Sequence, residues 1–533
     1  MQNESKPTLD LLSDRWSNLW RARSYDVLPA LRVRGPELRN SLRTVTMAWM
    51  FGSIWWVAIG PATMVALGNL AGFNDFHWGL LAALTYAATP AQIPSSYLIE
   101  RTGLRKQPFL YISGIQRLLW VFVGLMPLAL FAFSSTTVIW MTMAIIFASW
   151  VFAHGAWPVW ATWMSDLIPP RIRGRYFARR NAYCILVQIA AAIAFGAILD
   201  AATNSRAPNT VANQPVLVWA LLGIFIVAGA FGLVDPLLFR RIRELARPAS
   251  RERLSLRQIF SEPLSNPQFV HYVASTATLT FSIALVAGFF AVTCRNFLNL
   301  DNVTTNFLLL ACGPIGAVVS SRLWGHIIDH YGLRAVLLLA TGASALTVWA
   351  WLLVPFNRPS AADPAFWDFL RHWAPLLVPH NPPGVLTVAV LATVLFLDGM
   401  VTLSGIPLAQ FNMLLSFSDK GGRSTYVAAS GVLVAIAGLL GGLTGGQVAQ
   451  WIRHFRWEIG PFVLVNYHLM FLASGVIRLG SLGWLAGMAD PGGKPLRKLF
   501  RDLPALVARG MAGMAFLPAE LIAALVRRIV RRF

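Results

Sequence analysis

The sequence predicts an all-α membrane protein in which about twelve transmembrane helices form two pseudo-symmetric six-helix bundles. Three observations support this fold class. The 533 residues are 56% hydrophobic and only 13% charged, whereas soluble domains carry about 25% charged residues. Apolar runs recur along the chain, each near the roughly 20 residues that a helix needs to cross the hydrocarbon core. A short motif also occurs once in each half of the chain, at matching places.

Six spans are expected in the N-terminal half. Length and hydropathy place them at 44–67, 77–99, 108–133, 138–163, 181–201 and 215–239. They form the first predicted domain, 44–239, which follows a polar tail at 1–43 that does not resemble a cleavable signal peptide. A basic stretch at 240–268 is too charged to enter a bilayer, so we expect a cytoplasmic linker there.

Six further spans are expected in the C-terminal half, at 269–293, 305–328, 334–356, 385–412, 425–451 and 461–489. They form the second predicted domain, 269–489. The aromatic segment 366–378 is expected to rest on the outer leaflet. The tail at 490–533 ends in ELIAALVRRIVRRF, which is typical of an interfacial helix on anionic lipids; a cytosolic helix packed on the protein is the alternative.

The distribution of charge sets the expected orientation. A net charge of +21 would suggest nucleic acid as the partner of a soluble protein. Here Lys and Arg are dense in the two tails, the linker and alternate loops, which is the positive-inside pattern. We therefore expect cytoplasmic termini, a bacterial inner membrane and no nucleic-acid partner. The three cysteines lie in or beside apolar runs without metal-ligand spacing, so no disulfide framework is expected.

The repeated motif defines the symmetry of the two halves. SYLIERTGLRK follows the second span and GHIIDHYGLRA follows the eighth; RGRYFARRNA follows the fourth span and GGRSTYVAAS the tenth. The halves therefore look like copies related by an axis along the membrane normal. With these motifs, the chain from about 44 to 489 resembles the major facilitator superfamily of secondary transporters.

The family's loop between helices two and three has the pattern G-x-x-x-D-R-x-G-R. The residues that fit it are Gly325, Asp329, Gly332 and Arg334 in the second half, and Glu100, Arg101, Gly103 and Arg105 in the first. Ser96, Leu104 and His330 depart from the pattern. Asp166, Arg173 and Arg175 resemble the family's loop between helices four and five.

The resemblance implies that these loops act as a gate. An acid at the end of a helix can cap the positive N-terminus of a helix in the other half; the family implies helix eleven as the partner of Glu100 and helix five as that of Asp329. Glycines in helix eleven permit close approach: Gly438, Gly441, Gly442, Gly445 and Gly446. Arg101, Arg105 and Arg175 are candidates to pair with Asp166. The alternative is that these charges only fix topology.

Asp398 is the leading candidate for the transport site, because it lies within the apolar run VLATVLFLDGMVTLSG of helix ten. Aligning the two halves sets it opposite Trp150, one turn from His154 in helix four. A desolvated carboxyl group can take up a proton on one side of the membrane and release it on the other. The alternatives are an Asp398 that holds neighbouring helices together and a His154 that is only a satisfied core residue.

Further candidates are aromatic or polar residues within spans. They are Trp55, Trp56, Trp157 and Trp160 for stacking on a flat solute, and Gln188, Gln410 and Asn412 as polar contacts. Packing or an interfacial belt is the alternative role for the tryptophans. Pro61, Pro158, Pro314 and Pro407 are expected to break helices near the site. Arg117, Arg322 and Arg478 lie toward cytoplasmic ends and are expected to snorkel.

The predicted function is secondary active transport of a small organic solute by alternating access. We expect proton-coupled uptake, with a proton or other cation as co-substrate and a sugar-like molecule as one option for the solute. An efflux antiporter of the same fold and a non-transporting membrane assembly factor are the alternatives. No enzyme constellation, cofactor loop or metal site is evident; His326, Asp329 and His330 have no third ligand. The default oligomeric state is a monomer.

Overall fold

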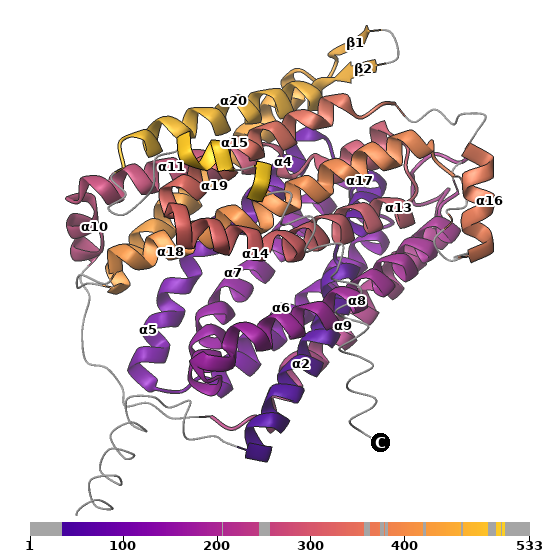
Figure 1. The fold of residues 1–533 in the computed structure, drawn as a ribbon. Helices are drawn as coiled ribbons and strands as arrows, with labels where there is room; N and C mark the ends of the chain where they lie inside the picture. The colour runs from indigo at the N-terminus through magenta and orange to yellow at the C-terminus, as the bar shows by residue number, and fades with distance from the viewer. Residues whose placement is uncertain are drawn as a thin grey trace, which may run out of the picture.

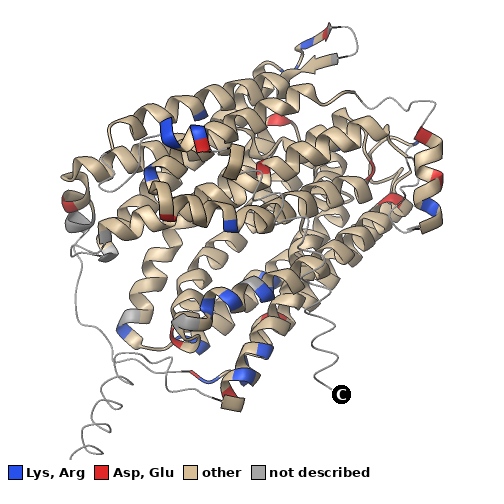
Figure 2. Cartoon of the chain, in the orientation of Figure 1, with Lys and Arg blue, Asp and Glu red and all other residues tan. Residues whose placement is uncertain are grey.

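The computed structural model describes residues 35–204, 206–244, 256–356, 363–373, 378, 382–418, 423–459, 462–488, 497–502 and 504–506, and these are almost entirely helical (Figure 1). Most of the helix expected in the C-terminal tail lies outside the described residues. Figure 2 shows that few positions on the helices carry charged side chains and that most of the ribbon is tan. This composition suits helices whose outer faces contact lipid.

The N-terminal half contains the elements α2 to η3. These are α2 (Gly35–Ala58), α3 (Pro61–Ala71), α4 (Asp75–Ala88), η2 (Thr89–Ala91), α5 (Gln92–Thr102), α6 (Lys106–Ala129), α7 (Ser135–Leu167), α8 (Pro170–Ala202), α9 (Pro215–Leu238) and η3 (Phe239–Arg241).

The C-terminal half contains the elements α10 to α20. These are α10 (Leu256–Leu264), α11 (Pro267–Ala287), α12 (Phe290–Val292), η4 (Thr293–Phe297), α13 (Asn302–Phe307), η5 (Leu308–Cys312), α14 (Gly313–Tyr331), α15 (Leu333–Trp349), η6 (Ala350–Leu353), α16 (Asp363–Trp373), α17 (Val385–Met400), η8 (Val401–Gly405), α18 (Ile406–Ser418), α19 (Arg423–Trp451), β1 (Arg456–Ile459), β2 (Phe462–Val465) and α20 (Asn466–Ala486).

Eleven helices among the described residues are long and apolar enough to cross a membrane. The remaining expected span, 77–99, is not continuous: the structure divides it into α4, η2 and α5. Pro90 lies inside the short 3₁₀ turn η2, and Pro94 lies in the first turn of α5. Neither residue has an amide hydrogen to donate to the preceding turn, which explains why the helix is interrupted there.

Three other spans begin well away from the position that hydropathy indicated. The fifth starts at Pro170 instead of residue 181. The first starts at Gly35 instead of residue 44 and is interrupted before Pro61, which begins α3. The last span starts at Asn466 instead of residue 461, because β1 and β2 form an antiparallel hairpin before it. Pro314 and Pro407 are the second residues of the helices that follow the π-helical turns η5 and η8. Pro158 is accommodated within α7 without ending it.

Each half has its own hydrophobic core. Trp55, Trp120 and Phe225 are buried together in the N-terminal half, and Phe269 and Trp324 are buried in the C-terminal half. Figure 1 shows the two halves as separate layers of helices, which α4 joins by lying against the C-terminal half.

The glycines of α19 permit this approach of α4. The resemblance implies the same glycines as the means by which Glu100 reaches helix eleven, and the Glu100 side chain lies outside the described residues. A Cβ atom added to Gly79 of α4 would overlap the backbone of Gly446, and one added to Gly442 would overlap Ala83. Gly441 and Gly445 lie equally close to the backbone of α11. With side chains no larger than hydrogen, α19 packs directly on helices from both halves.

Hydrogen bonds join the halves at one end of the molecule. We call the end that carries Arg101 and Arg105 the basic end and the other the opposite end. At the opposite end, the Asp200 carboxylate accepts hydrogen bonds from the amide nitrogens of Asn302 (2.8 Å) and Val303 (3.1 Å), at the first turn of α13. At the basic end, α5 packs against α7 of its own half.

Three more contacts connect the halves away from the basic end. Asn69 and Asn296 exchange hydrogen bonds of 2.8 and 3.0 Å between their side-chain amides. The Asp75 carboxylate accepts from the Asn466 amide (2.8 Å) and from the Tyr467 hydroxyl (2.7 Å). The Ala62 amide donates to Asn306 Oδ1 over 3.2 Å. Together with Asp200, these polar contacts hold the opposite end closed.

We expect closure of the opposite end to weaken as pH rises through about 6. Asp301 lies between two spans, where it caps α13 close to Asp200 and Arg295. Burial raises the pKa of its carboxyl group from an ordinary 3.8 to about 6. The charge of Asp200 adds to this rise, whereas Thr304 and Arg295 oppose it. If opening admits water, the pKa falls back, so the closed state binds the proton more tightly. Protonation therefore favours closure fully below pH 3.8, and this contribution is lost as pH rises through about 6.

Spin labels at the exposed residues Arg206 and Asn299 would measure this opening. The average distance between the labels should lengthen between about pH 4 and about pH 7. Asp301→Asn should remove most of this dependence, since an amide does not titrate. A distance that shortens as pH rises, or an unchanged pH dependence in the Asp301→Asn variant, would contradict the assignment.

Candidate functional site

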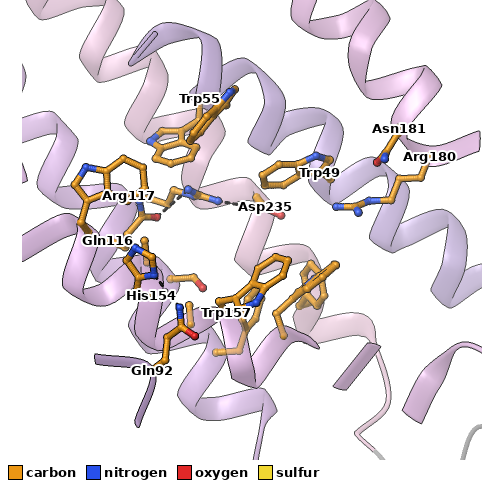
Figure 3. A pocket seen from close by; sticks show the side chains of 18 of the residues that line it. Trp49, Trp55, Gln92, Gln116, Arg117, His154, Trp157, Arg180, Asn181 and Asp235 are labelled. Atoms are coloured by element: carbon orange, nitrogen blue, oxygen red, sulfur yellow. Dashed lines mark hydrogen bonds and ion pairs between the residues drawn. The ribbon is translucent and has the colours of Figure 1, made fainter. Parts of the chain in front are cut away.

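A cavity of about 810 Å³ lies within the N-terminal bundle (Figure 3). This volume is in the range of pockets that hold small organic ligands. Its lining comes from α2, η3 and the helices α5 to α9, and consists of Trp49, Trp55, Trp56, Gln92, Phe109, Ser113, Gln116, Arg117, Trp150, Ala153, His154, Ala156, Trp157, Trp160, Phe177, Arg180, Asn181, Asp235 and Phe239. Nine of these nineteen residues are Trp or Phe, so the cavity combines flat apolar walls with a few charged groups.

A buried ion pair between Arg117 and Asp235 faces the cavity. Arg117 Nη2 donates to Asp235 Oδ2 over 2.9 Å, and Arg117 Nη1 donates to Gln116 Oε1 over 2.8 Å. The guanidinium carbon lies 3.5 Å from the ring centroid of Trp55. An arginine held by a carboxylate, an amide and an aromatic face is well compensated for the loss of water. The expectation that Arg117 snorkels is therefore wrong.

Two glycines make room for this pair. A Cβ atom on Gly52 would come within 2.9 Å of Asp235 Oδ2, and one on Gly232 would come within 3.0 Å of Arg117 Cδ. Larger residues at either position would displace the charged groups. The pair is thus built into the packing of α2, α6 and α9.

Arg180 is a second cation in the cavity wall. Its side chain is 7% exposed and points toward Trp49 in Figure 3. The guanidinium carbon lies 5.3 Å from the ring of Trp49, 5.4 Å from that of Trp160 and 5.7 Å from that of Phe177. Within the described residues, no acid forms an ion pair with Arg180, and its Nε has no hydrogen-bond partner. The cavity therefore contains two permanent cations and one carboxylate.

His154 lies in the cavity wall, where the sequence places a candidate for the transport site. Its Nδ1 is 3.0 Å from Gln92 Nε2, and its Nε2 is 3.5 Å from Thr85 Oγ1. When Gln92 donates to Nδ1, the neutral ring carries its proton on Nε2 and presents it to Thr85. The Trp150 ring lies 6.2 Å from the imidazole.

The tryptophan candidates also converge here. Trp55, Trp150 and Trp157 line the cavity together with Trp56 and Trp160. Trp157 stacks on Trp160 with a centroid distance of 5.4 Å and an interplanar angle of 28°. Its side chain is nevertheless 58% exposed, so ring surface remains free for a ligand.

Asp398 lies in a different part of the molecule. Its two carboxylate oxygens accept hydrogen bonds from Thr347 of α15 and Thr402 of η8, each over 2.8 Å. It does not line the N-terminal cavity with His154, so the expected pairing across the pseudo-twofold axis is not present. The carboxylate instead joins helices of its own half.

The remaining polar candidates also lie outside the cavity lining. Gln188 Nε2 is 3.4 Å from Ser53 Oγ. The Gln410 backbone oxygen accepts from the Tyr272 hydroxyl, and the Asn412 amide donates to the Leu408 carbonyl. Arg478 does not snorkel as expected: it is buried and donates to the Ser344 carbonyl over 2.8 Å.

The repeated Gly-Leu-Arg has a backbone explanation. Gly103 ends α5 and Gly332 ends α14, with φ angles of +66° and +90°, a region that L-residues with a Cβ rarely adopt. The arginines that follow fix neighbouring helices. Arg105 pairs with the buried Asp166, as the sequence predicts, and Arg334 donates to the carbonyls of Leu485 and Ala486. These residues organise the basic end of each bundle.

The other gate candidates are placed as follows. Arg173 donates to the carbonyls of Ser165 and Ile168, while Arg101, Arg175 and Asp329 are exposed and Gly325 is half-buried. The Glu100 side chain lies outside the described part of the structure. The described residues contain no group of three or more His, Cys, Asp or Glu side chains that would hold a metal ion.

Comparison with known proteins agrees with this architecture. The profile of the Major Facilitator Superfamily matches residues 42–442. The citrate-proton symporter of Klebsiella pneumoniae is 24% identical over 212 residues, which make up 38% of this chain and 43% of that protein. The chain thus matches less than half the length of this curated relative.

Solved structures show the same fold over most of the chain. The inward-open xylose transporter XylE from E. coli has a TM-score of 0.55 at 12% identity and covers 87% of this chain and 99% of its own. The nucleoside transporter NupG has a TM-score of 0.52 at 10% identity, covering 85% of this chain and 99% of its own. A family match over three quarters of the chain and a shared fold lead to one conclusion: the protein belongs to the Major Facilitator Superfamily of secondary transporters and is not an enzyme.

Proposed function

We propose that the protein accumulates a small organic solute through the N-terminal cavity, coupled to proton movement. The observation that carries this proposal is the Arg117–Asp235 pair, a buried carboxylate and guanidinium that face a cavity inside a membrane-spanning bundle. Charged groups at this depth are costly, and in transporters they mark pathways for solutes and protons.

The pair provides a simple means of coupling. Protonation of Asp235 would remove the one carboxylate among the described residues of the cavity wall and leave the positive charge of its two arginines available to a solute. Loss of the proton would restore the Arg117–Asp235 pair and weaken the attraction of the cavity wall for the solute. Binding of proton and solute would then be mutually favourable, which is the thermodynamic requirement for symport.

Alternating access would supply the transport cycle. The halves are joined by hydrogen bonds at the opposite end, and opening that end requires Asp200 and Asp75 to release their partners. With the positive-inside rule, the basic end faces the cytoplasm of a bacterial inner membrane. The partial likeness to a citrate-proton symporter supports proton-coupled uptake.

Purified protein in proteoliposomes provides the test. An outside-acidic gradient of one pH unit should concentrate a bound solute up to about tenfold for one proton per solute, because one pH unit corresponds to about 1.4 kcal/mol. A protonophore should abolish the accumulation. Accumulation under the reversed gradient would indicate antiport, and absence of flux for every bound solute would favour the assembly-factor alternative; either result would overturn the proposal.

A further inference from the structure

We infer that the solute is an aromatic carboxylate, held by Arg180 and the tryptophans of the N-terminal cavity. This inference rests on the proposed function, because it names the class of solute that the same cavity would carry.

The balance of charge favours an anion. Arg117 already has a carboxylate partner, whereas Arg180 has no ion-pair partner among the described residues although it is 7% exposed. The acid whose charge acts on Arg180, Asp235, is paired directly with Arg117. A buried guanidinium that no carboxylate contacts directly is unfavourable. A ligand carboxylate would neutralise Arg180 and can accept two of its hydrogen bonds at once. A cationic ligand would instead add to the excess of positive charge.

The unpaired hydrogen-bonding atoms point the same way. Within the described structure, three side chains of the cavity lining have a buried polar atom without a hydrogen-bond partner: Trp55, Arg117 and Arg180. In each case the atom is an N–H donor. These three atoms are closed off from the cavity, so a ligand would meet Arg180 at its terminal nitrogens, which are also N–H donors without a partner in the described structure. Such a ligand must supply acceptors, as a carboxylate does and an ammonium group does not.

The shape of the wall favours a flat apolar body. Trp157 is stacked on Trp160 yet remains 58% exposed, and Trp56 is 40% exposed. Neither ring needs a hydrogen bond to accept a planar group, and offset stacking of aromatic rings stabilises a complex beyond the area buried. The cavity of about 810 Å³ accommodates one ring or two fused rings together with their carboxylate arm.

Thermal melting with matched ligands tests the inference on the full-length protein. The anions are phenylacetate and 2-naphthylacetate, the neutral analogues are the corresponding amides, and 2-phenylethylamine is the cation. Cyclohexylacetate keeps the charge and removes the aromatic ring. We expect at least one aromatic carboxylate to raise the melting temperature saturably, with its amide at least about tenfold weaker, cyclohexylacetate several-fold weaker and the amine without effect.

Variants of two adjacent arginines locate the contact. Arg180→Gln should weaken binding of the aromatic carboxylate about 10- to 100-fold, as expected for loss of a charged hydrogen bond. Arg179→Gln should bind like the wild type, because Arg179 is exposed and lies outside the cavity lining. The comparison of acid and amide on the wild type needs no variant and therefore remains decisive if Arg180→Gln is unstable.

The outcomes separate the inference from the proposed function. Amides that bind as tightly as the acids, an unchanged affinity in Arg180→Gln, or binding of none of the aromatic acids would overturn the inference. If an amide or amine binds instead and is accumulated by a proton gradient, transport stands and the anion assignment fails. If an aromatic acid binds through Arg180 but is not accumulated, the anion assignment stands and proton-coupled transport fails.

Discussion

Replacing Arg117 with methionine should lower the free energy of unfolding by about 3–5 kcal/mol, because the change leaves the buried Asp235 carboxylate without its counter-charge. Methionine keeps much of the side-chain volume, so cavity formation adds little. The three cysteines permit a direct measurement: Cys184 and Cys294 are buried, and a thiol-reactive dye would report their exposure as the protein melts.

Two further variants distinguish the ion pair from general packing. Arg117→Met combined with Asp235→Leu should recover most of the lost stability, since no charge then remains unpaired, but should not recover transport. Arg371→Met removes a partner from the exposed pair with Asp368 and should change stability by less than about 1 kcal/mol. If Arg117→Met alone melts like the wild type, the pair does not stabilise the bundle as described.

The substitution Gly79→Ala should force α4 away from α19, because the added methyl group would overlap the backbone of Gly446. Neither backbone can move without disturbing its own helix, so overpacking should cost about 1–3 kcal/mol or more. The opposite end depends on this contact, and transport should fall along with the melting temperature. Melting and proteoliposome uptake measure the two effects.

The matched control is Gly480→Ala in α20, where an added Cβ meets no atom within 4 Å. Replacing a helical glycine by alanine there should leave the melting temperature unchanged or raise it. Equal stability of the Gly79 and Gly480 variants would show that α4 and α19 are not as closely packed as the structure has them.

Much of the architecture can be predicted from the sequence, because it depends on local chemistry. Apolar runs mark the spans, and the repeated Gly-Leu-Arg marks two helix ends where Gly103 and Gly332 adopt positive φ angles. The glycine spacing of α19 predicts a close helix contact, and the contact is present. Composition and spacing are enough for such features, because each concerns one element or one repeated turn.

The site was only partly predictable, because hydropathy gives the depth of a residue but not its partners. Asp235 and Asp398 are both acids within apolar runs, and only packing shows that Asp235 meets Arg117 while Asp398 meets Thr347. Arg180 belongs to a basic loop motif by sequence, yet it lies in the aromatic wall of the cavity. For Asp235, the sequence signal was an acid followed by proline within the apolar run GLVDPLL, near the end of the sixth span.

The most direct test of whether the N-terminal cavity contains the coupling group compares two variants, Asp235→Asn and Asp398→Asn. Each is reconstituted in proteoliposomes, and solute accumulation driven by a pH gradient is measured. Asparagine is close to aspartate in size but does not titrate at these pH values. The cavity site predicts that Asp235→Asn loses gradient-driven accumulation while Asp398→Asn retains it with an unchanged pH dependence. Retained accumulation in the Asp235→Asn variant, with loss in the Asp398→Asn variant, would contradict the assignment and place coupling in the C-terminal half.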